Sequence, residues 1–332
     1  MLQYLIILLD DTSTSYCHYN NSKSKKRLIS LDDLKTGILF AMKQNLTIQF
    51  VYPAYEIPKE HQEAIETIDH VKIMPASCKD GARSVSTTAD VLVFNSCKDA
   101  INRVSTENDD KILVLRMCGR DAWQCVSIPD TDALPCVSTI TTNRLNIIIT
   151  DTETFTEKDF ENYKQWLSEL ATTVVETYGN TSPHNGKIPQ INLLTDRILL
   201  KKMNNCNAGV ENITLAPNGK FYICPAFYYD DEKDDVGSLK DGLNIKNQQL
   251  YKLEYAPLCR NCDAYQCKRC VWLNKKTTLE VNTPSHEQCV AAHLERNASE
   301  KLLNELKTKG YFPDVKIPAI DYLDPFEKIT NL

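Results

Sequence analysis

Apolar runs rich in isoleucine, valine and leucine alternate with amphipathic or polar stretches over the first 195 residues of the chain. This alternation is typical of repeated β-α units. Each run is continuous enough to be buried on both faces, as parallel strands are. The pattern predicts six parallel strands, over Gln3–Leu9, Thr47–Tyr52, Val71–Pro75, Asp90–Asn95, Lys111–Arg116 and Leu145–Thr150.

Helices are predicted after the first and sixth strands and near the C-terminus. Ser30 is a good N-cap, and the two acids that follow it are favourable in the first turn of a helix. A second helix begins after Thr156 and runs towards residue 178. A third has apolar residues at helical spacing between 291 and 306, and Gly310 ends it.

The chain divides at a segment dense in turn residues, 178–189. We predict a β/α domain over residues 1–195, a cysteine-rich domain over 196–295, and a helix end with an extended tail over 296–332. Within the second part, Pro217-Asn218-Gly219 predicts a hairpin turn between two short apolar strands. The acidic run at 230–235 is expected to be a solvated loop.

Composition excludes several classes of protein. Of the 332 residues, 42% are hydrophobic and 25% charged, as in ordinary globular proteins. The net charge of -6 provides no basic field for a phosphate backbone, so we expect no nucleic-acid partner. The first apolar run ends after nine residues and lacks a basic flank, so we expect no signal peptide, no membrane span and a cytoplasmic location.

Cysteine is unusually frequent, with 13 residues, of which seven fall between Cys206 and Cys289. Four of these form two adjacent C-x-x-C pairs, and each pair can present both sulfurs to one cation. Clustered cysteines in a reducing compartment indicate metal ligands, whereas buried free thiols would need an apolar pattern that the charged residues around them do not provide. The predicted ligands are Cys206, Cys224, Cys259, Cys262, Cys267, Cys270 and Cys289.

This order of cysteines resembles the SPASM domain of peptide-modifying radical S-adenosylmethionine (SAM) enzymes, although two gaps are each one residue short. The resemblance implies two auxiliary 4Fe–4S clusters. It assigns Cys259, Cys262, Cys267 and Cys289 to one cluster, and Cys206, Cys224 and Cys270 to the other. His286 is a candidate for the missing fourth ligand, the alternative being a surface histidine.

The β/α units are similar to the partial (β/α)6 barrel of radical SAM enzymes, so the resemblance covers nearly the whole chain. That family carries C-x3-C-x2-C after its first strand, but here Asp10, Thr14 and Cys17 stand in those places. Its Gly-Gly-Glu-Pro turn is replaced by 52–58, which contains no glycine. The resemblance therefore implies a degenerate barrel that does not bind or cleave SAM.

Polar residues end the predicted strands, where the site of a parallel barrel is expected. They are either ordinary strand-end residues or the rim of a peptide-binding mouth. The candidate rim residues are Asp10, Asp11, Glu56, Arg116 and Asp151.

A degenerate barrel with a SPASM-like domain resembles the CXXX-repeat peptide maturase family, chiefly over residues 267–289. This implies an accessory protein, not an independent enzyme, that acts with a Cys-repeat precursor peptide and a true radical SAM maturase. One or two 4Fe–4S clusters would bind peptide or relay electrons. The alternative is a zinc-stabilised peptide-binding scaffold, with Cys259, Cys262, Cys267 and either Cys270 or Cys289 as ligands.

Overall fold

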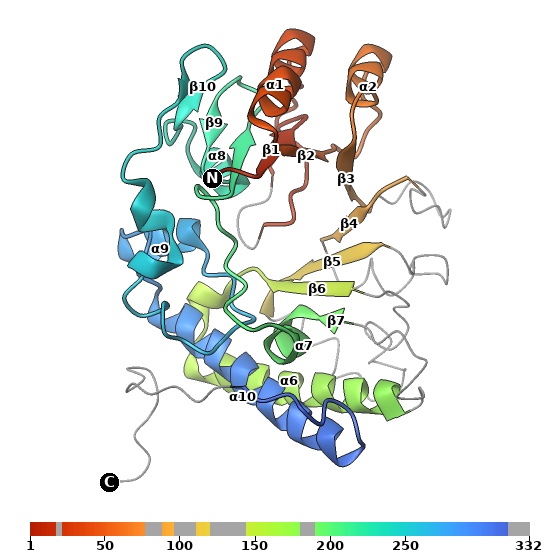
Figure 1. The fold of residues 1–332 in the computed structure, drawn as a ribbon, viewed down its shortest axis with the longest axis vertical. Helices are drawn as coiled ribbons and strands as arrows, with labels where there is room; N and C mark the ends of the chain where they lie inside the picture. Colours follow the sequence, from red (N-terminus) through yellow and green to blue (C-terminus); the bar gives the residue numbers. More distant parts are fainter. Residues whose placement is uncertain (18–21, 77–87, 96–110, 120–143, 180–189, 318–332) are drawn as a thin grey trace. The chain divides into compact units, whose positions relative to one another are not determined.

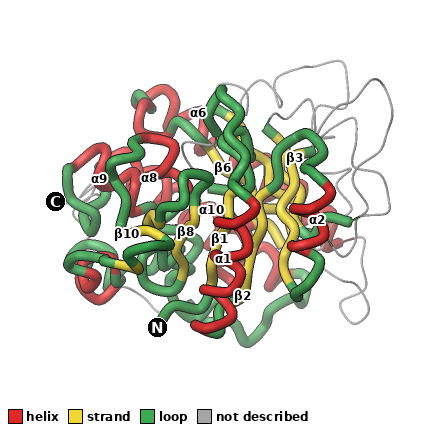
Figure 2. The backbone as a smooth tube through the Cα atoms, turned by 90° about the horizontal axis from the view of Figure 1, so that it is seen from above, coloured by secondary structure: helices red, strands yellow, loops and turns green. Residues whose placement is uncertain are grey.

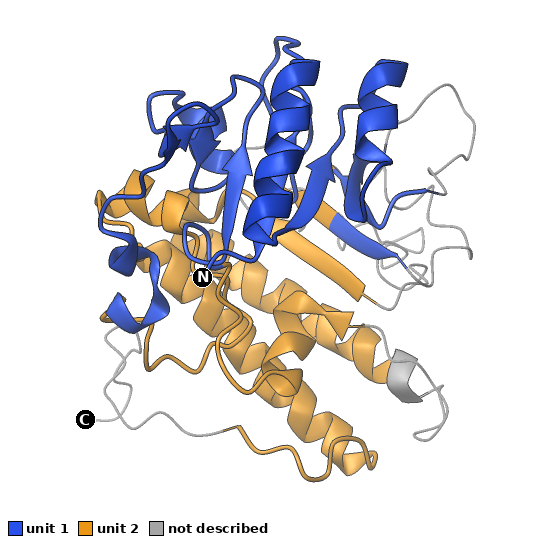
Figure 3. Cartoon of the chain, turned by 45° about the horizontal axis from the view of Figure 1, so that its top comes forward, with its two compact units in different colours: residues 1–94, 111–114, 207–255 blue, residues 95–110, 115–206, 256–332 orange. Residues whose placement is uncertain are grey.

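The described part of the protein is α/β, with a nine-stranded, mostly parallel sheet and helices. A computed structural model describes residues 1–17, 22–76, 88–95, 111–119, 144–179 and 190–317. The chain forms two compact units, coloured separately in Figure 3. Unit 1 comprises residues 1–94, 111–114 and 207–255, and unit 2 comprises 95–110, 115–206 and 256–332.

The strands of unit 1 follow the order β5-β4-β3-β2-β1-β8-β9, with the first residues of β5 included. The central strand β1 pairs in parallel on both edges, so that Tyr4 lies opposite Thr47 on one side and Asn212 on the other. Only β9 runs antiparallel to its neighbour among the strand pairs described in this unit's main sheet. The strands are β1 (Tyr4–Leu8), β2 (Thr47–Val51), β3 (His70–Pro75), β4 (Val91–Phe94), β8 (Asn212–Leu215) and β9 (Phe221–Tyr222).

Helices α1 (Leu31–Gln44) and α2 (Lys59–Ile65) lie side by side next to these strands (Figures 1 and 2). The predicted N-cap of α1 is confirmed, because Ser30 Oγ accepts a hydrogen bond from Asp33 N at 3.0 Å. The predicted hairpin between β8 and β9 is confirmed as well, with Gly219 in the left-handed region at φ 74°. The remaining elements of unit 1 are α8 (Pro225–Asp230), β10 (Gly237–Ser238), β11 (Gly242–Leu243), and the 3-10 turns η2 (Gln248–Tyr251) and η3 (Leu253–Tyr255).

Unit 2 contains the strands β7-β6-β5 and the two longest helices of the described chain. Helix α10 packs on both α6 and α7 and buries Leu302, Leu303 and Leu306, as its apolar spacing predicts. The elements are β5 (Ile112–Met117), β6 (Arg144–Ile149), η1 (Thr152–Thr154), α6 (Glu157–Gly179), β7 (Gln190–Ile191), α7 (Asn192–Leu199), α9 (Val271–Thr278) and α10 (His286–Thr308).

All six predicted strands are present, with ends shifted by at most one residue. The compact units, however, do not follow the division predicted at residue 195. Strand β8 pairs with β1, β9 pairs with β8, and both belong to unit 1. Their side chains Ile213, Leu215 and Phe221 are fully buried in the same core as Leu5 and Ile7. The end of the predicted tail, 318–332, lies outside the described residues.

Candidate metal centre

Six of the seven predicted cysteine ligands belong to unit 2, and Cys224 belongs to unit 1 at the start of α8. Within the described part of the chain, none of the seven forms a disulfide. Four lie in the segment 259–270 that precedes α9, and Cys289 lies in the first turn of α10. Residues 204–206 run along this segment, with Cys206 N donating to Lys268 O at 3.0 Å.

The turns of this segment direct backbone N–H groups at sulfur. Cys262 Sγ accepts from Ala264 N, and Cys267 Sγ accepts from Arg269 N, both at 3.4 Å. Hydrogen bonds of this kind favour the charged thiolate over the neutral thiol. Because thiolates are the form that binds metal, the donor arrangement fits a metal centre.

Three of the thiols affect one another electrostatically. Burial raises the pKa of Cys259 to about 11, an effect that Arg269 opposes and the neighbouring Cys262 increases. Burial also raises the pKa of Cys267, and Cys259 and Cys262 raise it further. Three adjacent thiolates here need a nearby positive charge, which a bound metal centre would provide.

Arg269 stands between Cys267 and Cys270 in an unusual conformation. Its φ is 45°, in the left-handed region, and its side chain is among the largest that are fully buried. Its Nε donates to Asn205 Oδ1 at 3.0 Å. The arginine therefore places a permanent positive charge near the thiols at the expense of local backbone strain.

Helix α10 brings one imidazole to the thiols. His293 Nε2 lies 3.8 Å from Cys262 Sγ. The side chain of His286, which sequence reasoning singled out, is 61% exposed, and its Nδ1 lies 3.6 Å from Glu287 Oε1. The sequence does not separate the two histidines, because His286 stands three residues before Cys289 and His293 four residues after it, and both spacings share a helix face.

Buried polar contacts fasten the cysteine segment to the helices of unit 2. Asp263 accepts from Arg197 of α7 at 2.7 Å and from Arg296 of α10 at 3.3 Å. Gln266 Nε2 donates to Ala292 O at 2.7 Å and to Glu295 at 3.2 Å. Burial raises the pKa of Glu295 to about 7, opposed by hydrogen bonds from Tyr163 and Gln266.

Within the ranges that the structure describes, no three His, Cys, Asp or Glu side chains converge on one point as the ligands of a single metal ion do. Cys259, Cys262, Cys267 and His293 are thus neighbours, but they are not arranged as the ligands of one metal ion.

The loop after β1 in unit 1 does not fit an iron–sulfur cluster that binds SAM. Of the three predicted positions only Cys17 has a sulfur, whereas such a cluster needs three cysteines to leave one iron open. Asp10 is fully buried and closes a local turn, in which its Oδ1 accepts from Thr12 N at 2.8 Å and its N donates to Ser13 Oγ at 3.0 Å. Thr14 is also buried.

Asp11 belongs to an ion-pair network that sequence reasoning missed. Its carboxylate accepts from Arg27 Nε at 3.1 Å and from the hydroxyl of Tyr228 in α8. Arg27 and Lys23 also pair with Glu232, which lies in the acidic run expected to be a solvated loop. Although burial opposes ionisation, these two cations lower the pKa of Glu232 to about 2.

The predicted rim residues are divided between the units. Asp10, Asp11 and Glu56 belong to unit 1, where only Glu56 is exposed. Arg116 and Asp151 belong to unit 2, where Arg116 is buried in β5 and Asp151 Oδ1 accepts from Gly119 N at 2.7 Å. The carboxylates of Asp10 and Asp11 therefore make their hydrogen bonds inside the fold and do not face solvent.

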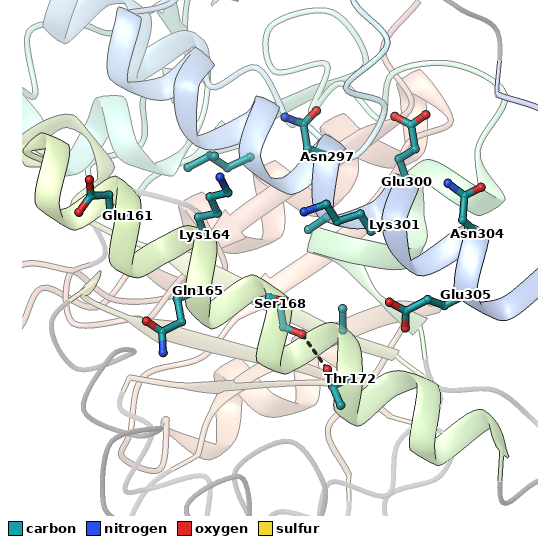
Figure 4. Close-up of a pocket in the computed structure, with 13 residues that line it drawn as sticks. Glu161, Lys164, Gln165, Ser168, Thr172, Asn297, Glu300, Lys301, Asn304 and Glu305 are labelled. Carbon is teal, nitrogen blue, oxygen red and sulfur yellow. Dashed lines mark hydrogen bonds between the residues drawn. The ribbon is translucent and has the colours of Figure 1, made fainter.

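A surface groove of about 780 Å³ lies between α6 and α10 of unit 2 (Figure 4). Its charged lining is mixed, with Lys164 and Lys301 among glutamates. No cysteine or histidine lines it, so it is separate from the thiol cluster.

No protein-family model and no curated protein matches the sequence. A solved structure of native anSMEcpe with bound AdoMet and Cp18Cys peptide is similar to this chain, with a TM-score of 0.59 and 12% sequence identity. The match covers 93% of this chain and 100% of that one. At this identity the likeness concerns the fold alone. No helix among the described residues has the length and apolar character needed to cross a membrane.

Proposed function

We propose that this protein is an accessory maturation protein for a Cys-repeat peptide, without SAM cleavage of its own. The observation that carries the proposal is the set of three neighbouring thiols, Cys259, Cys262 and Cys267. They occur in a chain with a radical-SAM-like fold, whose loop after β1 contains one cysteine where such enzymes have three. The thiols support a metal-dependent role, and the loop supports the loss of radical chemistry.

The proposed cofactor of the protein is one or two 4Fe–4S clusters, which supply one-electron transfer when bound. Cys259, Cys262, Cys267 and Cys289 would hold the first cluster. Cys206, Cys224 and Cys270 would contribute to the second. Arg269 keeps positive charge beside the first set, and the N–H groups of Ala264 and Arg269 orient two of its sulfurs.

The proposed partners are a Cys-repeat precursor peptide and a radical SAM maturase, in the cytoplasm. The likeness to anSMEcpe, whose structure contains a Cp18Cys peptide, supports a peptide partner. The proposed contact surface is the exposed part of the candidate rim, represented in unit 1 by Glu56.

Binding of a labelled peptide of Cys-x-x-x repeats tests this function, with a Ser-x-x-x peptide as the matched control. We expect metal-loaded protein to bind the cysteine peptide at micromolar concentration and to leave SAM intact. Equal binding of both peptides would contradict the proposed partner. Formation of 5'-deoxyadenosine by the protein alone would contradict the loss of radical chemistry.

A zinc-stabilised peptide-binding scaffold is the second candidate. The contact between Cys262 and His293 favours it, because three cysteines and one histidine are a common donor set of structural zinc. Anaerobic purification followed by iron, zinc and sulfide analysis separates the candidates. Iron with acid-labile sulfide supports the first function, and zinc without sulfide supports the second.

A further inference from the structure

Helix α10 carries a cysteine and a histidine in its first turns. Its first residue is His286, and Ser285 caps it by accepting from Gln288 N at 3.2 Å. Cys289 and His293 follow four residues apart, so they lie on one face of the helix. His293 reaches the thiols, with its Nε2 3.8 Å from Cys262 Sγ.

The position of His293 is set by contacts on both sides of it in the helix. Ala292 O accepts from Gln266, and Arg296 donates to the Asp263 carboxylate. Glu295 accepts from Gln266 as well. Gln266 and Asp263 both lie between the cysteines of the segment, so the turn of α10 that carries His293 is fixed directly against them. Such contacts hold a ligand's ring in place.

We propose that His293 is a nitrogen ligand of the metal centre that Cys259, Cys262 and Cys267 bind. Three sulfurs and one imidazole are four donors, which is the number that a tetrahedral zinc ion or a 4Fe–4S cluster takes from a protein. The proposal rests on the proposed function in one respect, namely that these thiols bind metal. In this centre His293 takes the place that the proposed function gives to Cys289.

A neutral imidazole in place of a thiolate changes the charge of the centre. The complex carries one negative charge less than it would with four cysteines, so an iron–sulfur centre would accept an electron more readily. We therefore expect His293→Cys to retain metal and to lower the reduction potential of the centre.

The test uses the full chain, purified anaerobically and reconstituted with iron and sulfide. Pulsed electron paramagnetic resonance of the reduced protein should show the coupling of a directly bound histidine nitrogen. This coupling should persist in His286→Ala, and vanish in both His293→Ala and His293→Cys. His293→Ala should bind the metal about 10–100-fold more weakly, whereas His293→Cys should keep its full iron content, which shows that the chain still folds.

If the purified protein holds zinc, the same variants are loaded with cobalt(II) and compared by visible absorption. The ligand-field bands should then change in His293→Ala and remain unchanged in His286→Ala. A metal-loaded wild type without a nitrogen ligand, or a His293→Ala variant that matches the wild type, would overturn the assignment of His293 alone. A wild type that takes up neither iron–sulfur nor zinc would overturn the metal-dependent function and this ligand with it.

Discussion

Asp263 accepts hydrogen bonds from two buried arginines, and Asp11 is paired with Arg27 and Tyr228. Each buried carboxylate thus has donors that offset part of its lost hydration. Glu295 differs, because its two donors are the neutral Tyr163 and Gln266. Burial raises the pKa of Glu295 to about 7, and the two hydrogen bonds oppose this rise only in part.

The raised pKa of Glu295 predicts a pH dependence of stability. In the unfolded chain a glutamate loses its proton near pH ~4.3, whereas the folded protein keeps this proton up to about pH 7. The contribution of protonated Glu295 to the free energy of unfolding is fully present below pH ~4.3 and is lost as the pH rises to 7. Glu295→Gln should remove this dependence and stabilise the protein at pH 8 by about 1–3 kcal/mol. Urea unfolding at pH 5.5 and pH 8 measures the effect, and parallel curves for both proteins would contradict it.

The Asp11 network predicts a cost for removing its cation. Arg27→Met leaves a carboxylate that is 3% exposed without its ionic partner. We expect a loss of about 1–3 kcal/mol in the free energy of unfolding, at the lower end because Arg27 itself is partly exposed. Lys59→Met is the control, since the Lys59–Glu63 pair is solvent-exposed and should contribute less than about 0.5 kcal/mol. Equal losses in the two variants would refute the role of the network.

Single-residue roles were only partly predictable from the sequence. The cysteines stand out through their spacing, but two histidines flank Cys289 and the sequence does not say which one turns inward. Glu232 could not be identified either, because its partners Lys23 and Arg27 lie more than two hundred residues away in the chain. Local patterns indicate exposure, whereas partners of this kind are set by the folded chain.

Strands and helices were easier to predict than the roles of single residues, because the sequence signals for them are local. The six strands are continuous apolar runs, and the caps of α1 and α10 are serines one residue before the helix. The pairing of β8 with β1 had no such signal, since each is an apolar run that fits several neighbours. Pairing is decided by packing, and here the contact between α1 and β8 shows how closely the two fit.

Gly37 of α1 packs closely against Leu215 of β8. A Cβ added at Gly37 would lie 2.4 Å from Leu215 Cδ2 of β8, so one of the two must move. Gly37→Ala should therefore destabilise the protein by about 1–3 kcal/mol. Combining it with Leu215→Val should cost less than the sum of the single changes, because the smaller side chain relieves the clash. Additive free energies in denaturant titrations would show that the two residues do not share this contact.

At the scale of the whole molecule, unit 1 is assembled from stretches that are far apart in the sequence, 1–94, 111–114 and 207–255. Residues 207–255 complete a core that includes Leu5, Ile7 and Ile48. The predicted domain 1–195 lacks this part. A fragment of residues 1–205 should therefore fail to fold cooperatively, whereas the full chain should unfold in a cooperative transition. Circular dichroism during thermal unfolding measures the difference, and a sharp transition in the fragment would contradict the assignment of β8 to this core.

The place of β8 beside β1 also bears on how the protein is made. A ribosome releases β1 and β2 early, yet the strand that covers the second edge of β1 is synthesised more than two hundred residues later. During that interval β1 offers an open edge of backbone N–H and C=O groups, flanked by apolar side chains. We therefore expect the nascent chain to be prone to pairing with another chain at this edge until residue 215 has been synthesised.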